Sequence, residues 1–233
     1  MLAGIAFCPQ PPLLVPELAA GAAAELDELR AACAQVVRRL LADRPDRVVV
    51  LGPGPRTAAY GPGASGTLAG YGVPVTASLG PAVAPPGAGA GPLPPALTLG
   101  AWLLGGVDVR CAGQAVGPDA DPAEPAAGLA GGTERTALLV MADGSACRSE
   151  SAPGYADPRA GPFDAAVAAA LRSGDPAALR DLDPAAGREL LAAGVPAWRV
   201  AGHAAGAGPY DAELLHDAAP YGVGYLVAAW TPR

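Results

Sequence analysis

Three short loops carry the side chains of this sequence that could act together on a ligand. They read CPQPP (8–12), GPGPRT (52–57) and ADGSACR (142–148), and each follows a strongly apolar stretch. In open parallel α/β sheets, ligands bind beyond the carboxyl ends of the strands. If the three stretches are neighbouring strands, one cleft collects Gln10, Gly54, Arg56, Asp143, Ser145, Cys147 and Arg148.

The first loop holds one polar side chain in a rigid frame. Prolines at positions 9, 11 and 12 fix φ and remove backbone donors, so Gln10 is presented at a defined angle. An amide is a poor metal ligand and cannot act as a general acid or base. Rigid presentation of one side chain at a strand end is how α/β enzymes build sites, so the frame predicts that Gln10 belongs to a site.

The two arginines suggest an anionic ligand. Guanidinium groups of Arg56 and Arg148 at the mouth of a cleft would suit a carboxylate or a phosphate. The alternative is that Arg148 pairs with Glu150 or Asp157 inside its own loop. Both interpretations stay open at this point.

Nucleophilic and metal chemistry have weaker support. A Ser145–His203–Asp143 arrangement is conceivable, but there is no G-x-S-x-G elbow, and Asp143 and Ser145 can instead cap a turn. Only two histidines occur. A metal site would have to combine them with a few cysteine and acidic side chains, and the alternative is two ordinary histidines. The residues of that set are His203, His216, Cys8, Cys147, Asp143 and Glu213.

The cysteines are expected to be reduced packing residues. Cys8, Cys33, Cys111 and Cys147 lie far apart and form no CxxC pair, which argues against a zinc site. Cys8 and Cys147 flank the expected cleft, so a redox pair between them is the alternative.

The elements that must position these loops follow from apolar patterning. A strand at 2–8, a helical pattern from Pro16 to Asp43 and a strand at 47–52 form a βαβ unit. We expect an α/β fold, a central mostly parallel or mixed sheet flanked by helices, in one domain over 1–233. Further expected strands cover 73–75, 78–79, 107–112 and 136–145, and two more close the chain around DAAPYG (217–222).

Helices and loops fill the remaining segments. The stretch from about Pro53 to Pro95 should be largely loop, and 117–134 should be a surface loop. Asp175 and Asp183 each precede a proline, which is typical of helix N-caps. The expected helices cover 97–104, 161–171, 176–182, 184–193 and 198–205.

Composition narrows the class of partner. The formal net charge is −7 and all 15 basic residues are arginine, which argues against nucleic-acid binding. No strongly apolar run approaches 18 residues, and no basic segment precedes the first apolar run. We therefore expect a soluble, cytoplasmic protein without a membrane segment.

The segments CPQPPLLVPE, RVVVLGPGP, LLVMADGSACR, PFDAAVAAAL and PYGVGYLVA together resemble the class III extradiol ring-cleavage dioxygenases. This superfamily includes the protocatechuate dioxygenase large subunit and the Memo-type proteins, and the chain is similar to a compact actinobacterial branch of it. The resemblance implies a fold like that of the extradiol dioxygenase catalytic subunit, a site for Fe(II), and assembly into oligomers.

The resemblance also places the family's histidines. A metal ligand in a P-H-P segment, a second in a P-H pattern and an acid/base in D-x-S-H fall on Gln10, Gly54 and Ala146, so all three histidines are replaced. Loss of two of the three ligands of a 2-His-1-carboxylate site would remove most of its affinity for Fe(II), and loss of an acid/base costs about 10²–10⁴ in rate.

The favoured interpretation is a non-catalytic or repurposed homologue that binds a small aromatic or carboxylate ligand in the old cleft, without a cofactor. One alternative is an active ring-cleaving dioxygenase with a non-standard Fe(II) site. Another is a structural or regulatory subunit of an oligomer, including a homo-oligomer.

Overall fold

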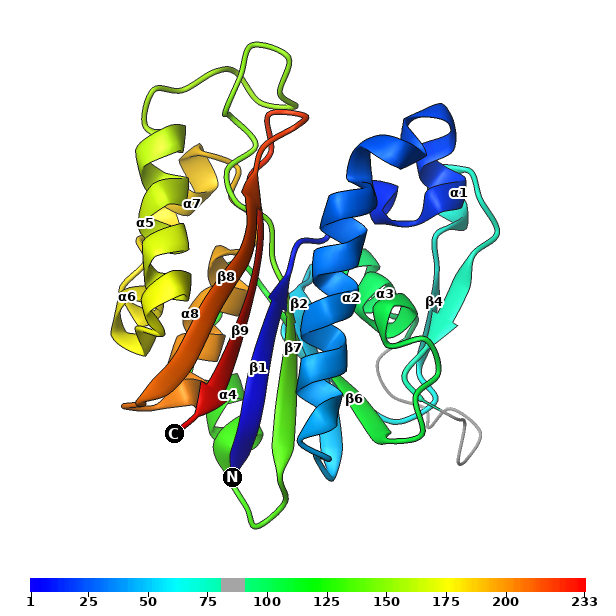
Figure 1. Cartoon of the computed structure of the whole chain (residues 1–233), viewed down its shortest axis with the longest axis vertical. Coiled ribbons are helices and arrows are strands. Elements are labelled where there is room, and N and C mark those ends of the chain that lie inside the picture. The colour runs from blue at the N-terminus through cyan, green and yellow to red at the C-terminus, as the bar shows by residue number, and fades with distance from the viewer. Residues whose placement is uncertain (81–90) are drawn as a thin grey trace.

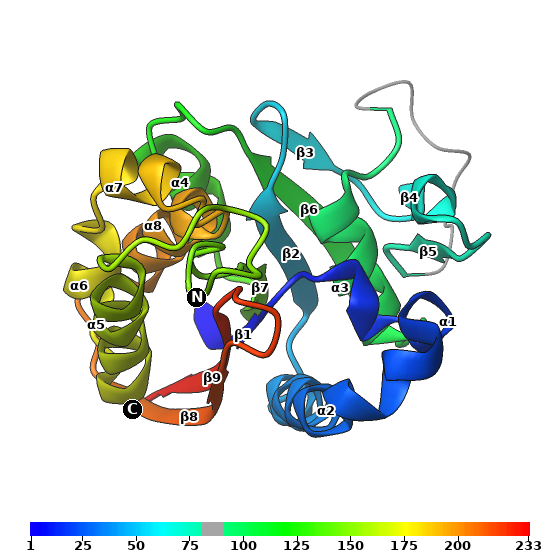
Figure 2. The same cartoon turned by 90° about the horizontal axis from the view of Figure 1, so that it is seen from above.

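A single mixed sheet forms the centre of the computed structural model, which describes residues 1–80 and 91–233. Within these residues its strand order is β3-β6-β2-β7-β1-β9-β8, with helices on both faces (Figures 1 and 2). The expected α/β fold is confirmed. The strands are β1 (Leu2–Cys8), β2 (Arg47–Pro53), β3 (Ala58–Tyr60), β6 (Arg110–Val116), β7 (Thr136–Met141), β8 (Tyr210–Ala218) and β9 (Tyr225–Pro232).

Four central strands run parallel, and the edges run antiparallel. β7 pairs with both β1 and β2, and β2 pairs with β6, all in parallel. β3, β9 and β8 are antiparallel to their neighbours. The carboxyl ends of β1, β2 and β7 therefore meet at one edge of the sheet, as the sequence predicted.

Alternating side chains of the central strands pack into two separate hydrophobic cores, one on each face of the sheet. Ala6 and Cys8 of β1 pack with the helices on one face, while Ile5 and Phe7 pack on the other. Because successive side chains of a strand point to opposite faces, a strand covered on both sides is apolar throughout. This explains the unbroken apolar runs read from the sequence.

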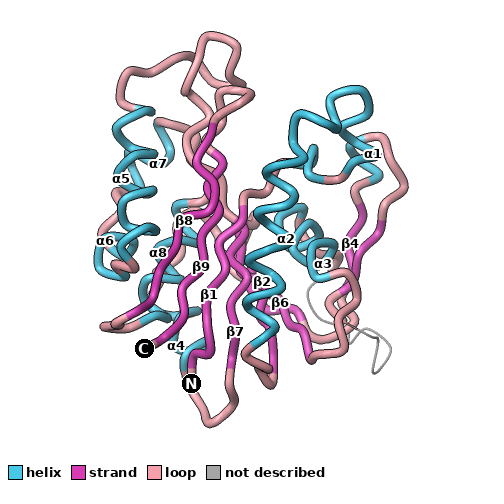
Figure 3. The backbone as a smooth tube through the Cα atoms, viewed as in Figure 1, coloured by secondary structure: helices cyan, strands magenta, loops and turns pink. Residues whose placement is uncertain are grey.

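Two helical layers cover the sheet (Figures 2 and 3). Contacts place α2 and α3 over β1, β2 and β7 on one face, and α8 and α5 over the other face. The α-helices are α1 (Pro16–Ala19), α2 (Asp27–Ala42), α3 (Pro95–Leu104), α4 (Ala123–Ala130), α5 (Ala160–Ser173), α6 (Pro176–Arg180), α7 (Pro184–Glu189) and α8 (Val195–Ala205). Among the described helices, none is both long and apolar enough to span a membrane.

The predicted N-caps are confirmed. The Asp175 carboxylate accepts hydrogen bonds from the N–H groups of Ala177 and Ala178, and Asp183 accepts one from Ala185. Each cap satisfies donors that the first helical turn leaves unpaired.

Several predicted elements need correction. The helical pattern expected over 16–43 is interrupted: Ala20 has φ +46°, a 3₁₀ segment covers Ala20–Leu26, and the long helix begins at Asp27. The expected loop over 117–134 contains α4. The strand expected at 107–112 begins at Arg110 instead, and the one expected over 136–145 ends at Met141.

The Gly- and Pro-rich middle contains more structure than expected. β3 joins the main sheet, and β4 (Ser65–Thr67) pairs with β5 (Thr76–Ser78) in a small second sheet. The expected strands at 73–75 and 78–79 are therefore replaced by one strand between them. The part of the predicted loop over 81–90 lies outside the described residues.

Candidate functional site

A pocket of about 320 Å³ that contains one carboxylate opens at the carboxyl ends of β1, β2 and β7. It brings together Gln10, which follows β1, Gly54, which follows β2, and Asp143, which follows β7. We call it the Asp143 pocket. Its lining is Gln10, Pro53, Gly54, Pro55, Tyr71, Pro94, Pro95, Ala96 and Asp143.

Asp143 is the carboxylate of this pocket, and its protonation is unusual. The side chain is half-buried, and its Oδ1 accepts a hydrogen bond of 2.7 Å from the Gln10 N–H. Burial raises the pKa of Asp143 to about 7, although the hydrogen bond from Gln10 acts in the opposite direction. The carboxyl group can therefore change its charge close to neutral pH.

Gln10 contributes to the pocket through its backbone as much as through its amide. Its N–H holds the Asp143 carboxyl group, while the side chain lines the cavity. Gly54 is required by close approach: a Cβ there would lie 2.9 Å from the Cβ of Ala115. Its own N–H donates to the carbonyl of Val116, which fastens the loop to β6.

A second, larger pocket adjoins the first. It has a volume of about 500 Å³ and shares the wall formed by Pro53, Gly54 and Pro55. We call it the apolar pocket. The rest of its lining comes from the end of β6 and from α7 and α8: Val116, Pro118, Pro184, Gly187, Arg188, Leu191, Ala192, Ala193, Val195 and Pro196.

Ser145 supports the loop after β7 and lines neither pocket. It is fully buried, its hydroxyl donates to the carbonyl of Leu190 at 2.8 Å, and the same oxygen accepts from the Cys147 N–H at 3.1 Å. A hydroxyl held in this way is unavailable as a nucleophile. The turn-stabilising interpretation fits this geometry.

Asp164 of α5 holds the same loop in place through two contacts. Its carboxylate accepts a hydrogen bond from the Ser145 N–H and forms an ion pair with Arg148, each at 2.8 Å. Arg148 therefore pairs with Asp164, and the expected partners Glu150 and Asp157 were wrong. The guanidinium of Arg148 forms a structural ion pair, and Arg148 lines neither pocket.

The other predicted cleft residues lie outside the two pockets. Arg56 is exposed and lines neither of them. Ala146 exchanges backbone hydrogen bonds with Leu190 and Gly154 and also lines neither. The structure therefore brings three of the predicted residues, Gln10, Gly54 and Asp143, into one pocket and places the others outside it.

His203 is far from Asp143. Gly194, just before α8, donates its N–H to the Asp143 carbonyl, so the beginning of α8 lies at the pocket edge. His203 lies eight residues after the first residue of that helix, Val195, which places it about 12 Å further along the axis. The Ser145–His203–Asp143 arrangement is thus not formed.

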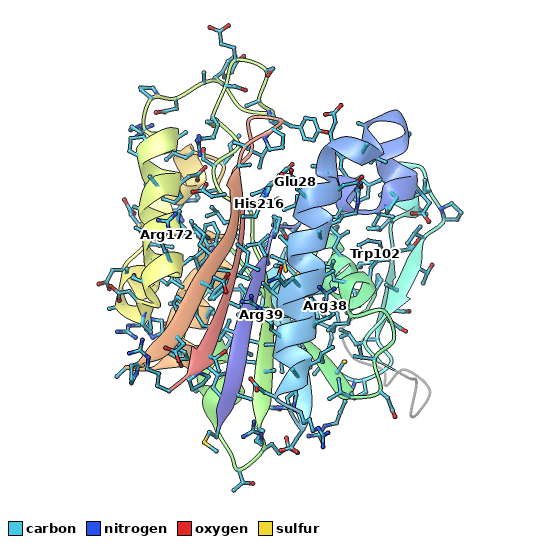
Figure 4. All side chains as sticks on the ribbon, viewed as in Figure 1. Glu28, Arg38, Arg39, Trp102, Arg172 and His216 are labelled. Atoms are coloured by element: carbon cyan, nitrogen blue, oxygen red, sulfur yellow. The ribbon has the colours of Figure 1, made fainter. Side chains whose placement is uncertain are left out.

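His216 lies on β8, next to α2 (Figure 4). Burial lowers its pKa, and the charges of Glu28 and Asp217 act in the opposite direction. It belongs to neither pocket. The two histidines therefore serve different parts of the fold.

The structure separates Cys8 from Cys147, so the alternative of a redox pair between them is not formed. Cys8 packs in the core beneath α2, in the same cluster as Cys33. Burial first, and then Cys33, raise the pKa of Cys8. Cys147 packs in a separate small cluster with Ala160 and Leu190.

The side chains at the implied iron positions do not fit an Fe(II) site. Gln10 supplies one neutral amide, Gly54 supplies no side chain, and Asp143 is the single carboxylate among the described residues of the pocket. In the described part of the chain, no three His, Cys, Asp or Glu side chains gather as metal ligands. The donor set lacks the imidazoles that a facial triad requires.

Two parts of the site, the α7–α8 segment and Asp164, were not identified from the sequence. The α7–α8 segment forms one side of the apolar pocket, and no motif in it signals a binding role. Asp164 did carry a signal: it shares a helical face with Val167, Ala168 and Leu171, all buried. An acidic residue on an apolar face at this spacing indicates a buried polar contact.

Comparisons with known proteins add little to this geometry. No protein-family model matches the chain, and a search of curated proteins finds no match. Among solved structures, the chain is similar to the uncharacterized protein JW3007 from Escherichia coli K12. The two are 14% identical with a TM-score of 0.48, over 98% of this chain and 99% of that one. At this level the likeness carries no inference about function.

Proposed function

We propose that this protein binds a small organic molecule at the carboxyl edge of its sheet, across the Asp143 pocket and the apolar pocket. The observation that carries the proposal is the shared wall Pro53–Pro55, which joins a cavity that holds the Asp143 carboxyl group to an apolar one. Ligand sites in proteins are typically apolar cavities with a few convergent polar groups. Their position at the strand ends is where open α/β sheets bind ligands.

An aromatic or similarly apolar body suits the larger cavity. Its wall combines proline rings, Val116, Leu191 and Val195, and Arg188 is the one charged side chain among its described lining residues. Arg188 pairs with Asp119 at 3.7 Å, so its charge is shared. Apolar contact, rather than charge, should dominate binding there.

The resemblance to class III extradiol dioxygenases supports a descent in which a reactive site became a binding site. Gln10 and Gly54, at the implied ligand positions, do line one pocket, but their chemistry does not fit iron. The proposal is therefore binding without ring cleavage. An iron-dependent activity remains the alternative that enzyme assays with Fe(II) and catechols would reveal.

The test is a fragment screen by ¹⁵N–¹H NMR, followed on the Gly54 amide, since Gly54 lines both pockets. Aromatic fragments should shift this resonance. Ala193→Trp should fill the apolar pocket and abolish the shifts, because Ala193 is an exposed lining residue that leaves room for the ring. Ala42→Trp, on the exposed end of α2, is the matched control. No shift of Gly54 by any fragment would refute the proposal.

A further inference from the structure

The Asp143 carboxyl group has a free hydrogen-bonding site. Oδ1 accepts the Gln10 N–H at 2.7 Å, and the backbone carbonyl accepts the Gly194 N–H at 2.9 Å. Among the described residues, neither an ion pair nor a hydrogen bond engages Oδ2. No side-chain oxygen or nitrogen of the described chain is both fully buried and unpaired. Oδ2 is therefore accessible to a ligand in the pocket.

The backbone of the pocket offers few donors. Of its nine lining residues, the four prolines at 53, 55, 94 and 95 have no backbone N–H. The backbone N–H groups of Gln10, Gly54 and Tyr71 are donated within the protein. Among the lining residues, only Ala96 and Asp143 retain a backbone N–H with no partner in the described structure. The side chains of Gln10 and Tyr71 can both donate and accept, so Asp143 supplies the one anionic acceptor among the described lining residues.

No described basic side chain balances the carboxylate. Arg148, the arginine of the same loop, is paired with Asp164. Two phenols lie near Asp143: Tyr71 lines the pocket, and Tyr225 at the start of β9 is close enough to interact with the charge of Asp143. Burial, together with the charge of Asp143, raises the pKa of Tyr225, so that phenol stays neutral. Among the described residues, no ion pair engages Asp143, so a cationic ligand could supply its counter-charge.

We propose that Asp143 recognises a protonated amine, on a ligand whose apolar body extends past Pro53–Pro55 into the apolar pocket. This inference rests on the proposed function and names the ligand class. An ammonium group supplies three donors and a positive charge to the unengaged Oδ2 of Asp143. A carboxylate ligand would meet Asp143 as a like charge.

Amine binding should also release a proton. Burial places the pKa of Asp143 at about 7, so part of the protein carries a protonated carboxyl group at that pH. A bound cation favours the ionised form and lowers the pKa. The heat of binding at pH 7 should therefore depend on the ionisation enthalpy of the buffer.

The test compares benzylamine, benzyl alcohol and benzoate by isothermal titration calorimetry at pH 7 in phosphate and in MOPS, two buffers without a primary amine whose ionisation enthalpies differ. Benzylamine should bind about tenfold or more tightly than either analogue. Asp143→Asn should remove this preference and the buffer dependence. Asp108→Asn, at an exposed carboxylate outside both pockets, should change neither.

Three outcomes would overturn the inference: equal or tighter binding of benzoate, an amine preference that survives Asp143→Asn, or no binding of benzylamine. The NMR resonance of the Gly54 amide distinguishes failure of this inference from failure of the proposed function. If neutral aromatic fragments still shift it, the site binds ligands of another class. If no fragment does, the proposed function fails as well.

Discussion

Replacing Asp143 by asparagine should stabilise the protein above neutral pH and leave it nearly unchanged in acid. The amide keeps an oxygen for the Gln10 N–H but cannot ionise. Burial raises the pKa of Asp143 from 3.8 to about 7 in the folded protein. Between these values the native state binds more protons than the unfolded state, so wild-type stability falls as the pH rises. Asparagine removes that loss.

The magnitude follows from the size of the pKa shift. Each pKa unit corresponds to about 1.4 kcal/mol, and the shift spans about three units, so the upper bound is about 4 kcal/mol. Because the side chain is half-buried, solvent screening reduces this value. We expect asparagine to increase the free energy of unfolding by about 2–4 kcal/mol at pH 8 and by nearly nothing at pH 4.

Urea unfolding from pH 4 to 8.5, followed by the fluorescence of the buried Trp198 and Trp230, measures this difference. All other titrating groups are common to both proteins and cancel. The exposed Asp108→Asn serves as the control and should give a flat difference. A difference between wild type and Asp143→Asn that is independent of pH, or that grows toward acid, would refute the reasoning.

Three further predictions concern the frame around the site. Asp164→Asn should lower the free energy of unfolding by about 2–4 kcal/mol, since it leaves the partly buried Arg148 without its counter-charge; an unchanged urea midpoint would contradict this. Gly100→Ala should cost about 1–3 kcal/mol, measured the same way, because its Cβ would lie 2.3 Å from Cγ1 of Val50. The four cysteines, each at most 4% exposed, should react with Ellman's reagent only in denaturant, and prompt reaction of the native protein would show that one is accessible.

The long-range architecture was predictable because it rests on strong apolar patterns. β1 and β2 are buried on both faces, and their sequences contain hardly any polar residue. The caps at Asp175 and Asp183 were equally clear, because an aspartate before a proline satisfies the first helical turn. These signals are local in the sequence, so no tertiary information was needed.

The missed elements depend on tertiary contacts. α4 contains Pro125 and Gly128, which disfavour a helix in isolation, yet it packs on α8 through Ala126 and Leu129. The break at Ala20 was hidden by the helix propensity of alanine, although the apolar stripe begins only at Leu26. Propensity favoured a continuous helix, whereas packing decided where it starts.

The position of the site could be predicted from the sequence, but only some of the residues that line it could be. Strand ends located Gln10, Gly54 and Asp143, because parallel strands bring their carboxyl ends together. The side chains of Ser145 and Arg148 belong to the same loop but turn to partners on other elements, Leu190 and Asp164. Such partners lie far away in the sequence and leave no spacing pattern.

The central place of β7 has a consequence for how the protein is made. Thr136 pairs with both Leu2 and Arg47, so a chain emerging from the ribosome holds β1 and β2 long before the strand that separates them exists. Closing such distant pairs is slow. Until then β1 lacks both of its neighbouring strands and β2 can pair only with β6, so newly made chains should be prone to aggregate at this stage. Synthesis of β7 is therefore the step that joins β1 to the part of the sheet formed by β3, β6 and β2.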